Sequence, residues 1–140
     1  MADSTTLIKA LDGHTIALCK GENIITSDKK GISPMIGFID DGADLRGYSA
    51  ADLVVGKAAA MLFVKAGLSE VFAKNLSKSG KEYLEKHEIT VKCDVHTDKI
   101  LNRSGDGICP MECAVSDTED FDEGYRLIKE KLEILMKKIK

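Results

Sequence analysis

With 140 residues the chain is long enough to bury one sizeable hydrophobic core, and we predict a single domain that spans residues 1–140. Its net charge of −3 excludes a general electrostatic attraction to nucleic acid or to anionic lipid. The N-terminus lacks the basic-then-apolar pattern of a signal peptide, and the apolar segment 50–66 is too short and too rich in Ala to span a bilayer. These features predict a cytoplasmic protein whose four cysteines are reduced thiols.

The first forty residues carry three local patterns. Residues 3–12 have apolar positions at helical spacing and are followed by Gly13, which predicts a short helix. Residues 15–19 and 23–26 flank a Lys-Gly-Glu turn and predict a β-hairpin. A second helix is predicted from Ser33, with Pro at its first position, to residue 39.

The stretch 49–67, which reads SAADLVVGKAAAMLFVKAG, predicts a helix at the centre of the fold. Ser49 followed by Asp52 is typical of a capped helix start, and Gly67 is a typical stop. Only Lys57 and Lys65 carry charge between these ends apart from Asp52, so we expect the helix to be covered on most of its circumference.

The second half of the chain predicts two alternating strands, a further short strand and three helices. The short strand follows its predecessor too closely for a crossover, so we expect the two to be antiparallel. The strands are expected at 70–76, 89–95 and 100–103, and the helices at 77–88, 109–115 and 121–140. Together with the first half, this order predicts an α/β fold, a three-layer sandwich with a mixed sheet of about five strands.

The segment 102–113, NRSGDGICPMEC, is the first candidate site. Gly105 and Gly107 allow close approach of a ligand, and Pro110 makes Cys109 the N-cap of a helix, where a thiol can become a nucleophilic thiolate. Asp106 and Glu112 oppose that change because they are negative. The alternative is a structural turn with an acid capping the helix, and local spacing favours it.

Lys57 is the second candidate. A cation within an apolar helix either extends to the surface along its stem or meets an anionic group in a cleft. Gly56 beside it costs about 1 kcal/mol of helix propensity, which indicates close packing or room for a ligand.

We predict no metal site and no cofactor. Cys109 and Cys113 share a helical face, but there is no Cys-x-x-Cys or His-x-Glu pattern, and the three histidines are scattered.

Three stretches resemble the family known as domain of unknown function 1893: KKGISPMIGFID (29–40), YSAADLVVGKAAAMLF (48–63) and ILNRSGDGICPMECAV (100–115). The resemblance covers nearly the whole chain and implies a cytidine deaminase-like fold. In true deaminases the buried helix carries a His-x-Glu zinc motif and the helix after the next strand carries Pro-Cys-x-x-Cys. Here those regions read Gly56-Lys57-Ala58 and SKSGKEYL, so the resemblance implies the fold and argues against zinc-dependent deamination.

Three functional hypotheses follow. The first is a cleft between the buried helix and the Gly-Asp-Gly-x-Cys-Pro loop that binds a nucleotide or another anionic small molecule. Its predicted ligand-binding residues are Ser49, Asp52, Lys57, Asn102, Arg103, Gly105 and Gly107. The second is a thiol-dependent enzyme with Cys109 as nucleophile and Asp106 or Glu112 handling protons. The third is a structural subunit of a homo-oligomer, and none of the three involves nucleic acid or a membrane.

Overall fold

The computed structural model describes residues 4–29, 31–100 and 107–139. Its strands are β1 (Ile16–Lys20), β2 (Asn23–Ser27), β3 (Ser49–Val55), β4 (Glu70–Ser77) and β5 (Thr90–Thr97). Its helices are α1 (Ser4–Leu11), α2 (Ser33–Asp40), α3 (Lys57–Ala66), α4 (Lys78–Lys86), α5 (Pro110–Val115) and α6 (Phe121–Ile139). None of the described helices is sufficiently long and apolar to cross a lipid bilayer.

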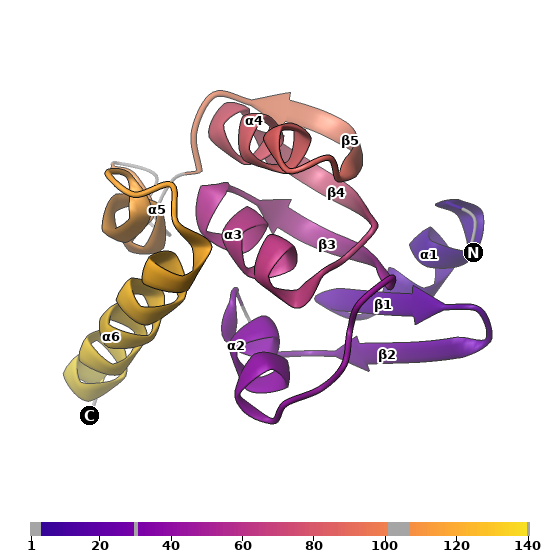
Figure 1. The fold of residues 1–140 in the computed structure, drawn as a ribbon, viewed down its shortest axis with the longest axis horizontal. Coiled ribbons are helices and arrows are strands. Elements are labelled where there is room, and N and C mark those ends of the chain that lie inside the picture. The colour runs from indigo at the N-terminus through magenta and orange to yellow at the C-terminus, as the bar shows by residue number, and fades with distance from the viewer. Residues whose placement is uncertain (1–3, 30, 101–106, 140) are drawn as a thin grey trace.

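The five strands form one mixed sheet in the order β2-β1-β3-β4-β5. β1 is antiparallel to both of its neighbours, whereas β3, β4 and β5 are parallel to one another. The two parallel connections each contain a helix, α3 and α4, and both helices lie on the same face of the sheet (Figure 1). A right-handed crossover puts successive helices on one face when the strands are added in one direction.

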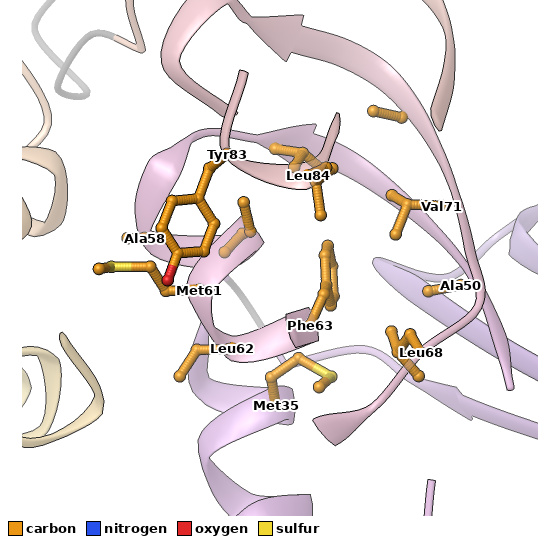
Figure 2. Close-up of a cluster of buried hydrophobic side chains, with 14 of the residues drawn as sticks. Met35, Ala50, Ala58, Met61, Leu62, Phe63, Leu68, Val71, Tyr83 and Leu84 are labelled. Atoms are coloured by element: carbon orange, nitrogen blue, oxygen red, sulfur yellow. The ribbon is translucent and has the colours of Figure 1, made fainter. Parts of the chain in front are cut away.

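Helices cover both faces, so the α/β fold has the three layers that the sequence predicts. The main core lies between the sheet and α2, α3 and α4, where Figure 2 shows Phe63 of α3 between Leu84 of α4 and Leu68. On the opposite face α1 buries Leu7 and Leu11 against the sheet. The hairpin, α1, α2, β4, α4, β5, α5 and α6 all occur where the sequence predicts them, within two or three residues at their ends.

The predicted helix 49–67 is wrong in its first half. Residues 49–55 form β3, the middle strand of the sheet, and the helix begins only at Lys57. A central strand buries both of its faces and therefore reads as a continuous apolar run, which resembles a helix that is covered all round. Gly56 is not a weak position inside the helix but its N-cap, in extended conformation. Gly67 ends the helix in the left-handed conformation, as predicted.

Among the described residues the sheet has five strands, and one of them, β3, was predicted as helix. The predicted short strand at 100–103 lies outside the described residues except for Ile100, whose carbonyl accepts a hydrogen bond from the Cys109 amide (2.9 Å).

Candidate functional site

The starts of α3 and α4 are packed closely against each other. Each helix follows the carboxyl end of a parallel strand, and β3 and β4 are neighbours, so the two helix starts lie side by side. A Cβ atom on Gly80 would lie 2.9 Å from the carbonyl carbon of Gly56 and 3.0 Å from the Val55 oxygen. The α4 backbone can approach the β3–α3 junction this closely only because residue 80 has no side chain.

Glu112 of α5 caps the start of α3. Its two carboxylate oxygens accept hydrogen bonds from the Lys57 and Ala58 amides, at 2.8 and 2.7 Å. These amides belong to the first turn of the helix, where no carbonyl within the helix can accept from them. Negative charge at this end also interacts favourably with the helix dipole. A side chain 55 residues away in sequence thus completes the helix that the extended Gly56 opens.

Gly56 is required by this cap rather than by an unusual backbone angle. A Cβ atom at position 56 would lie 2.2 Å from Oε1 of Glu112, far inside van der Waals contact. Glycine at the end of β3 therefore leaves the space that the carboxylate occupies.

A second carboxylate pairs with the Lys57 ammonium group. Glu119, in the connection between α5 and α6, places one oxygen 2.9 Å from Lys57 Nζ and the other 3.7 Å from Lys86 Nζ. Lys57 Nζ also donates to the carbonyl of Ser116 at 3.4 Å. The hydrogen bond from Lys57 holds the pKa of Glu119 below its ordinary value. The Lys57 side chain is only 14 % exposed, whereas that of Glu119 is 61 % exposed.

Tyr83 contacts the backbone of Glu119, the acid of this ion pair. Its hydroxyl donates to the backbone carbonyl of Glu119 at 2.9 Å, and its pKa is raised to about 12 by burial and by the neighbouring acids Glu119, Asp120 and Asp122. The phenol therefore remains protonated and acts as a hydrogen-bond donor at physiological pH.

A cleft of about 200 Å³ opens over this group of side chains. It is lined by Lys57, Ser79, Glu82, Tyr83, Lys86 and Glu119. The cleft contains two ammonium groups, two carboxylates and two hydroxyls, so it suits a small polar ligand better than an apolar one.

The predicted site residues of β3 lie elsewhere. Ser49 begins the strand and Lys57 follows its end, so about 26 Å of nearly extended chain separates them. Both Ser49 and Asp52 are buried within the sheet. They take no part in the cleft, and the helix cap that was predicted for them does not exist, because these residues belong to a strand.

Asp52 is nonetheless unusual. Its carboxyl accepts a hydrogen bond from the Leu53 amide at 2.8 Å, and it is only 8 % exposed. Burial raises its pKa to about 8, against the weaker opposite effect of the Leu53 and Val54 amides. The carboxyl is therefore largely protonated at neutral pH.

The candidate loop before α5 is only partly described. Asn102, Arg103, Gly105 and Asp106 lie outside the described residues, and of the predicted glycines only Gly107 lies within them. Cys109 is the N-cap of α5, as predicted, but its side chain makes no capping hydrogen bond.

Glu112 was predicted as a proton-transfer residue beside Cys109. Both of its carboxylate oxygens accept hydrogen bonds from the start of α3 instead. This geometry favours a structural role for Glu112. The fold does bring the Glu112 carboxylate to the backbone amide of Lys57.

The cysteines and histidines do not assemble into a centre. Cys19 is buried, Cys93 and Cys109 are half-buried, Cys113 is exposed, and all four are free thiols. Within residues 4–29, 31–100 and 107–139, no three His, Cys, Asp or Glu side chains are grouped so that they could hold a metal ion.

The sequence reasoning missed five cleft residues: Ser79, Glu82, Tyr83, Lys86 and Glu119. All of them except Glu119 lie on the polar-faced helix that the sequence does predict, and a search at the starts of helices that follow parallel strands could have found Ser79. Glu119 carries no local signal, since only the packing of α5 and α6 against α3 brings it to Lys57.

A second hollow of about 320 Å³ lies on the α1 face of the sheet. Its apolar part includes Ile8, Leu11, Leu53 and Phe72, and charged side chains such as Lys74 and Asp94 stand at its border. It contains none of the predicted site residues.

Two comparisons with known proteins agree with each other. Residues 6–132 match the family described as Domain of unknown function (DUF1893). Among solved structures, the chain is similar to the crystal structure of a DUF1893 family protein from Thermotoga maritima, with a TM-score of 0.83 and 24 % sequence identity over 94 % of this chain and 92 % of that one. No curated protein matches the sequence. Because the family match covers most of the 140 residues, the chain belongs to the DUF1893 family.

Proposed function

We propose that this protein binds an anionic small molecule, such as a nucleotide, in the cleft at the starts of α3 and α4. The observation that carries the proposal is the position of the Glu119 carboxylate, which bridges Lys57 and Lys86 at the mouth of the cleft. Its side chain is largely exposed, while Lys57 is largely buried. A phosphate or carboxylate of a ligand could displace Glu119 and use the same two ammonium groups.

Two further groups support an anionic ligand. The Ser79 hydroxyl lies in the first turn of α4, whose N-terminal end carries partial positive charge, and Tyr83 contributes a hydroxyl that stays protonated. The acid Glu82 restricts the ligand to one whose charge is directed towards the lysines.

The proposal includes a cytidine deaminase-like arrangement of the fold without zinc chemistry. It is supported by a mixed sheet between helices in which α3 and α4 follow adjacent strands. The resemblance would put zinc ligands at the starts of these two helices. The residues present there are Gly56-Lys57-Ala58 and Ser77-Lys78-Ser79-Gly80, which offer no thiolate or imidazole, so they do not fit zinc.

The thiol-dependent enzyme is the weaker alternative. Glu112 is held at the start of α3 by two hydrogen bonds and cannot at the same time accept a proton from Cys109. The alternative would regain support if iodoacetamide labelled Cys109 well below pH 8 and faster than the exposed Cys113.

The proposal can be tested by titrating inorganic phosphate and cytidine 5′-monophosphate into isotopically labelled protein. We expect saturable shifts of the Lys57, Ser79 and Tyr83 backbone amides. Lys57→Ala removes a charge-assisted bond and should weaken binding by about tenfold or more. Glu119→Gln removes the internal competitor and should strengthen it.

Lys65→Ala is the matched control, because Lys65 also belongs to α3 and also pairs with one acid, Asp122, but lies outside the cleft. It should leave the affinity unchanged. If neither probe shifts these amides, or if Lys65→Ala weakens binding as much as Lys57→Ala, the proposed site is wrong.

A further inference from the structure

The hollow on the α1 face of the sheet is larger than the cleft, at about 320 Å³ against about 200 Å³. The eight-residue α1 is the one described helix on this face, and it lies near the hairpin and β3 (Figure 1). In the hollow Leu11 and Phe72 are buried, Leu53 is half-buried and Ile8 is exposed. An apolar cavity of about 150 Å³ can bind benzene. This hollow therefore has room for an aromatic ring and several further atoms.

The three parallel strands interrupt their pairing at the level of the hollow. β3 and β4 pair at Asp52↔Ala73 and again at Val54↔Asn75, and β4 and β5 skip the corresponding level. The register is the same before and after the gap, so the strands are distorted together rather than shifted. The residues at the skipped level, one from each strand, are Leu53, Lys74 and Asp94, and all three line the hollow.

Side chains of the sheet itself satisfy the backbone groups of this interruption. The Leu53 amide donates to the Asp52 carboxyl at 2.8 Å, and the Leu53 carbonyl accepts from the side-chain amide of Asn75 at 3.3 Å. The distortion is thus held in place by the fold. Local interruptions of a strand ladder redirect side chains and are common beside binding sites.

Lys74 and Asp94 place opposite charges next to each other at the border of the hollow. They occupy the same level of adjacent parallel strands, whose spacing is about 4.8 Å. Both residues are exposed, and neither forms an ion pair with a described residue. An ammonium group and a carboxylate are therefore available side by side, above an apolar floor.

The α1 end of the hollow adds one charge of each sign. Lys9 and Asp12 line it there, again without an ion pair to a described residue, while Nδ1 of His14 is engaged with Asp28 at 2.7 Å. With His14 neutral, the charges around the hollow balance. Complementary charge therefore favours a ligand that carries both signs over one with a net charge.

We propose that this hollow binds a free amino acid with an apolar side chain. Such a molecule carries a carboxylate and an ammonium group on one carbon atom, and an apolar group on the same carbon. Lys74 donates to the carboxylate, Asp94 accepts from the ammonium group, and the apolar side chain lies on Leu53 and Phe72. The site is separate from the cleft at the starts of α3 and α4, and it does not depend on the function proposed for that cleft.

The alternative is that the hollow contains only solvent and that Lys74 and Asp94 are ordinary surface charges. Titration of L-phenylalanine into isotopically labelled protein distinguishes the two. We expect saturable shifts of the Leu53, Phe72 and Asp94 backbone amides. Two analogues test the charges: 3-phenylpropionate lacks the ammonium group and 2-phenylethylamine lacks the carboxylate. Each should bind about tenfold more weakly than L-phenylalanine, because one charge of the site is left without its partner.

Variants of the two charged residues assign each charge of the ligand. Asp94→Asn should weaken L-phenylalanine about tenfold and remove its advantage over 3-phenylpropionate. Lys74→Gln should weaken it similarly and remove its advantage over 2-phenylethylamine. Both residues are exposed, so neither variant should disturb folding. Lys81→Gln, at an exposed lysine of α4 on the other side of the sheet, is the matched control and should leave the affinity unchanged.

Three results would overturn the proposal. The first is the absence of saturable shifts with L-phenylalanine. The second is a set of shifts confined to Lys57, Ser79 and Tyr83, which would put the amino acid in the cleft. The third is an affinity for either analogue that equals the affinity for L-phenylalanine, since the paired charges would then have no part in recognition.

Discussion

The helices α3 and α4 begin at neighbouring positions of the same sheet edge, yet their first turns are satisfied in opposite ways. α4 uses its own N-cap: the Ser77 hydroxyl accepts a hydrogen bond from the Gly80 amide three residues later, at 3.0 Å. α3 starts from Gly56, which has no side chain, and the acceptor is Glu112 from another helix. The start of α4 is therefore complete within its own sequence, whereas the start of α3 depends on the tertiary fold.

The difference also explains where a ligand could act. A first turn that is filled by its own hydroxyl is fixed as soon as the helix forms. The first turn of α3 instead depends on the Glu112 carboxylate, and Lys57 beside it is paired with Glu119. These contacts would be lost if α5 or the connection after it moved away. In the proposed site, an anionic ligand would therefore affect the start of α3 more than the start of α4, which is capped by its own Ser77.

The largest difference in stability between the two units, β3–α3 and β4–α4, is expected to come from Asp52 of β3. This residue pairs in register with Ala73 of β4, which cannot ionise. The pKa of Asp52 is raised to about 8, so above about pH 4 the unfolded chain loses a proton that the folded protein retains. The contribution of Asp52 to the free energy of unfolding is therefore fully present at acidic pH. It declines as pH rises towards 8, by up to about 1.4 kcal/mol per pH unit.

Asp52→Asn keeps the carbonyl acceptor for the Leu53 amide but cannot ionise. We expect it to remove this pH dependence and to stabilise the protein by about 3 kcal/mol at neutral pH, measured by urea unfolding between about pH 5 and 8. An unchanged slope would show that Asp52 is ionised in the folded protein.

The packing between the two units should be the next most sensitive feature. Gly80→Ala adds a Cβ atom 2.9 Å from the Gly56 backbone, and the atoms that it meets are backbone atoms of Val55 and Gly56, which cannot move aside easily. We expect a loss of about 2 kcal/mol in the free energy of unfolding, despite the better helix propensity of Ala.

Gly37→Ala is the matched control, since Gly37 also lies inside a helix but a Cβ atom there would meet nothing within 4 Å. It should stabilise the protein by about 0.5–1 kcal/mol. Equal effects at the two positions would contradict the close contact of α4 with the β3–α3 junction.

The two caps can be compared directly. Glu112→Ala leaves the buried Ala58 amide and its neighbour without their acceptor and should cost about 2 kcal/mol. Ser77→Ala removes one neutral hydrogen bond and should cost about 1 kcal/mol. Thermal or chemical unfolding of both variants measures the difference. If Ser77→Ala were the more damaging change, the long-range cap would contribute little to the stability of α3.

The smallest effect is expected from the exposed ion pair. Glu119→Gln should cost at most about 0.5 kcal/mol at neutral pH, since the carboxylate is largely exposed to solvent. Because Lys57 lowers the pKa of Glu119, this contribution is present above the pKa of the unfolded chain and is lost as pH falls through the folded value. The variant and the natural protein should therefore converge in stability at acidic pH and in high salt. A difference that persists there would indicate a role other than charge pairing.

Local signals account for most of the elements that the sequence predicts correctly. The hairpin is marked by Gly21 between two apolar runs, α2 by Pro34 in its first turn, and the end of α3 by Gly67. Each of these residues constrains the backbone within a few positions, so no knowledge of the fold is needed. The start of α4 belongs to the same class, since Ser77 caps it from the adjacent position.

The candidate site was only partly accessible to the same reasoning. Lys57 was identified because a charge in an apolar run is visible in the sequence. Its partner Glu119 and the cleft residue Lys86 were missed, since each is an ordinary charged residue of an exposed segment. Ser49 and Asp52 were chosen because they imitate a helix cap, and a strand of the buried sheet contains them instead.

The sequence by itself determined the α/β class, the order of most elements and the positions where helices stop, because these depend on spacing, on Gly and on Pro over short distances. The tertiary structure alone decided that residues 49–55 form a strand, because burial on two faces removes the alternation that distinguishes strand from helix. It also decided that carboxylates of α5 and its following connection meet the start of α3. Such contacts join residues more than fifty positions apart, and no local pattern encodes them.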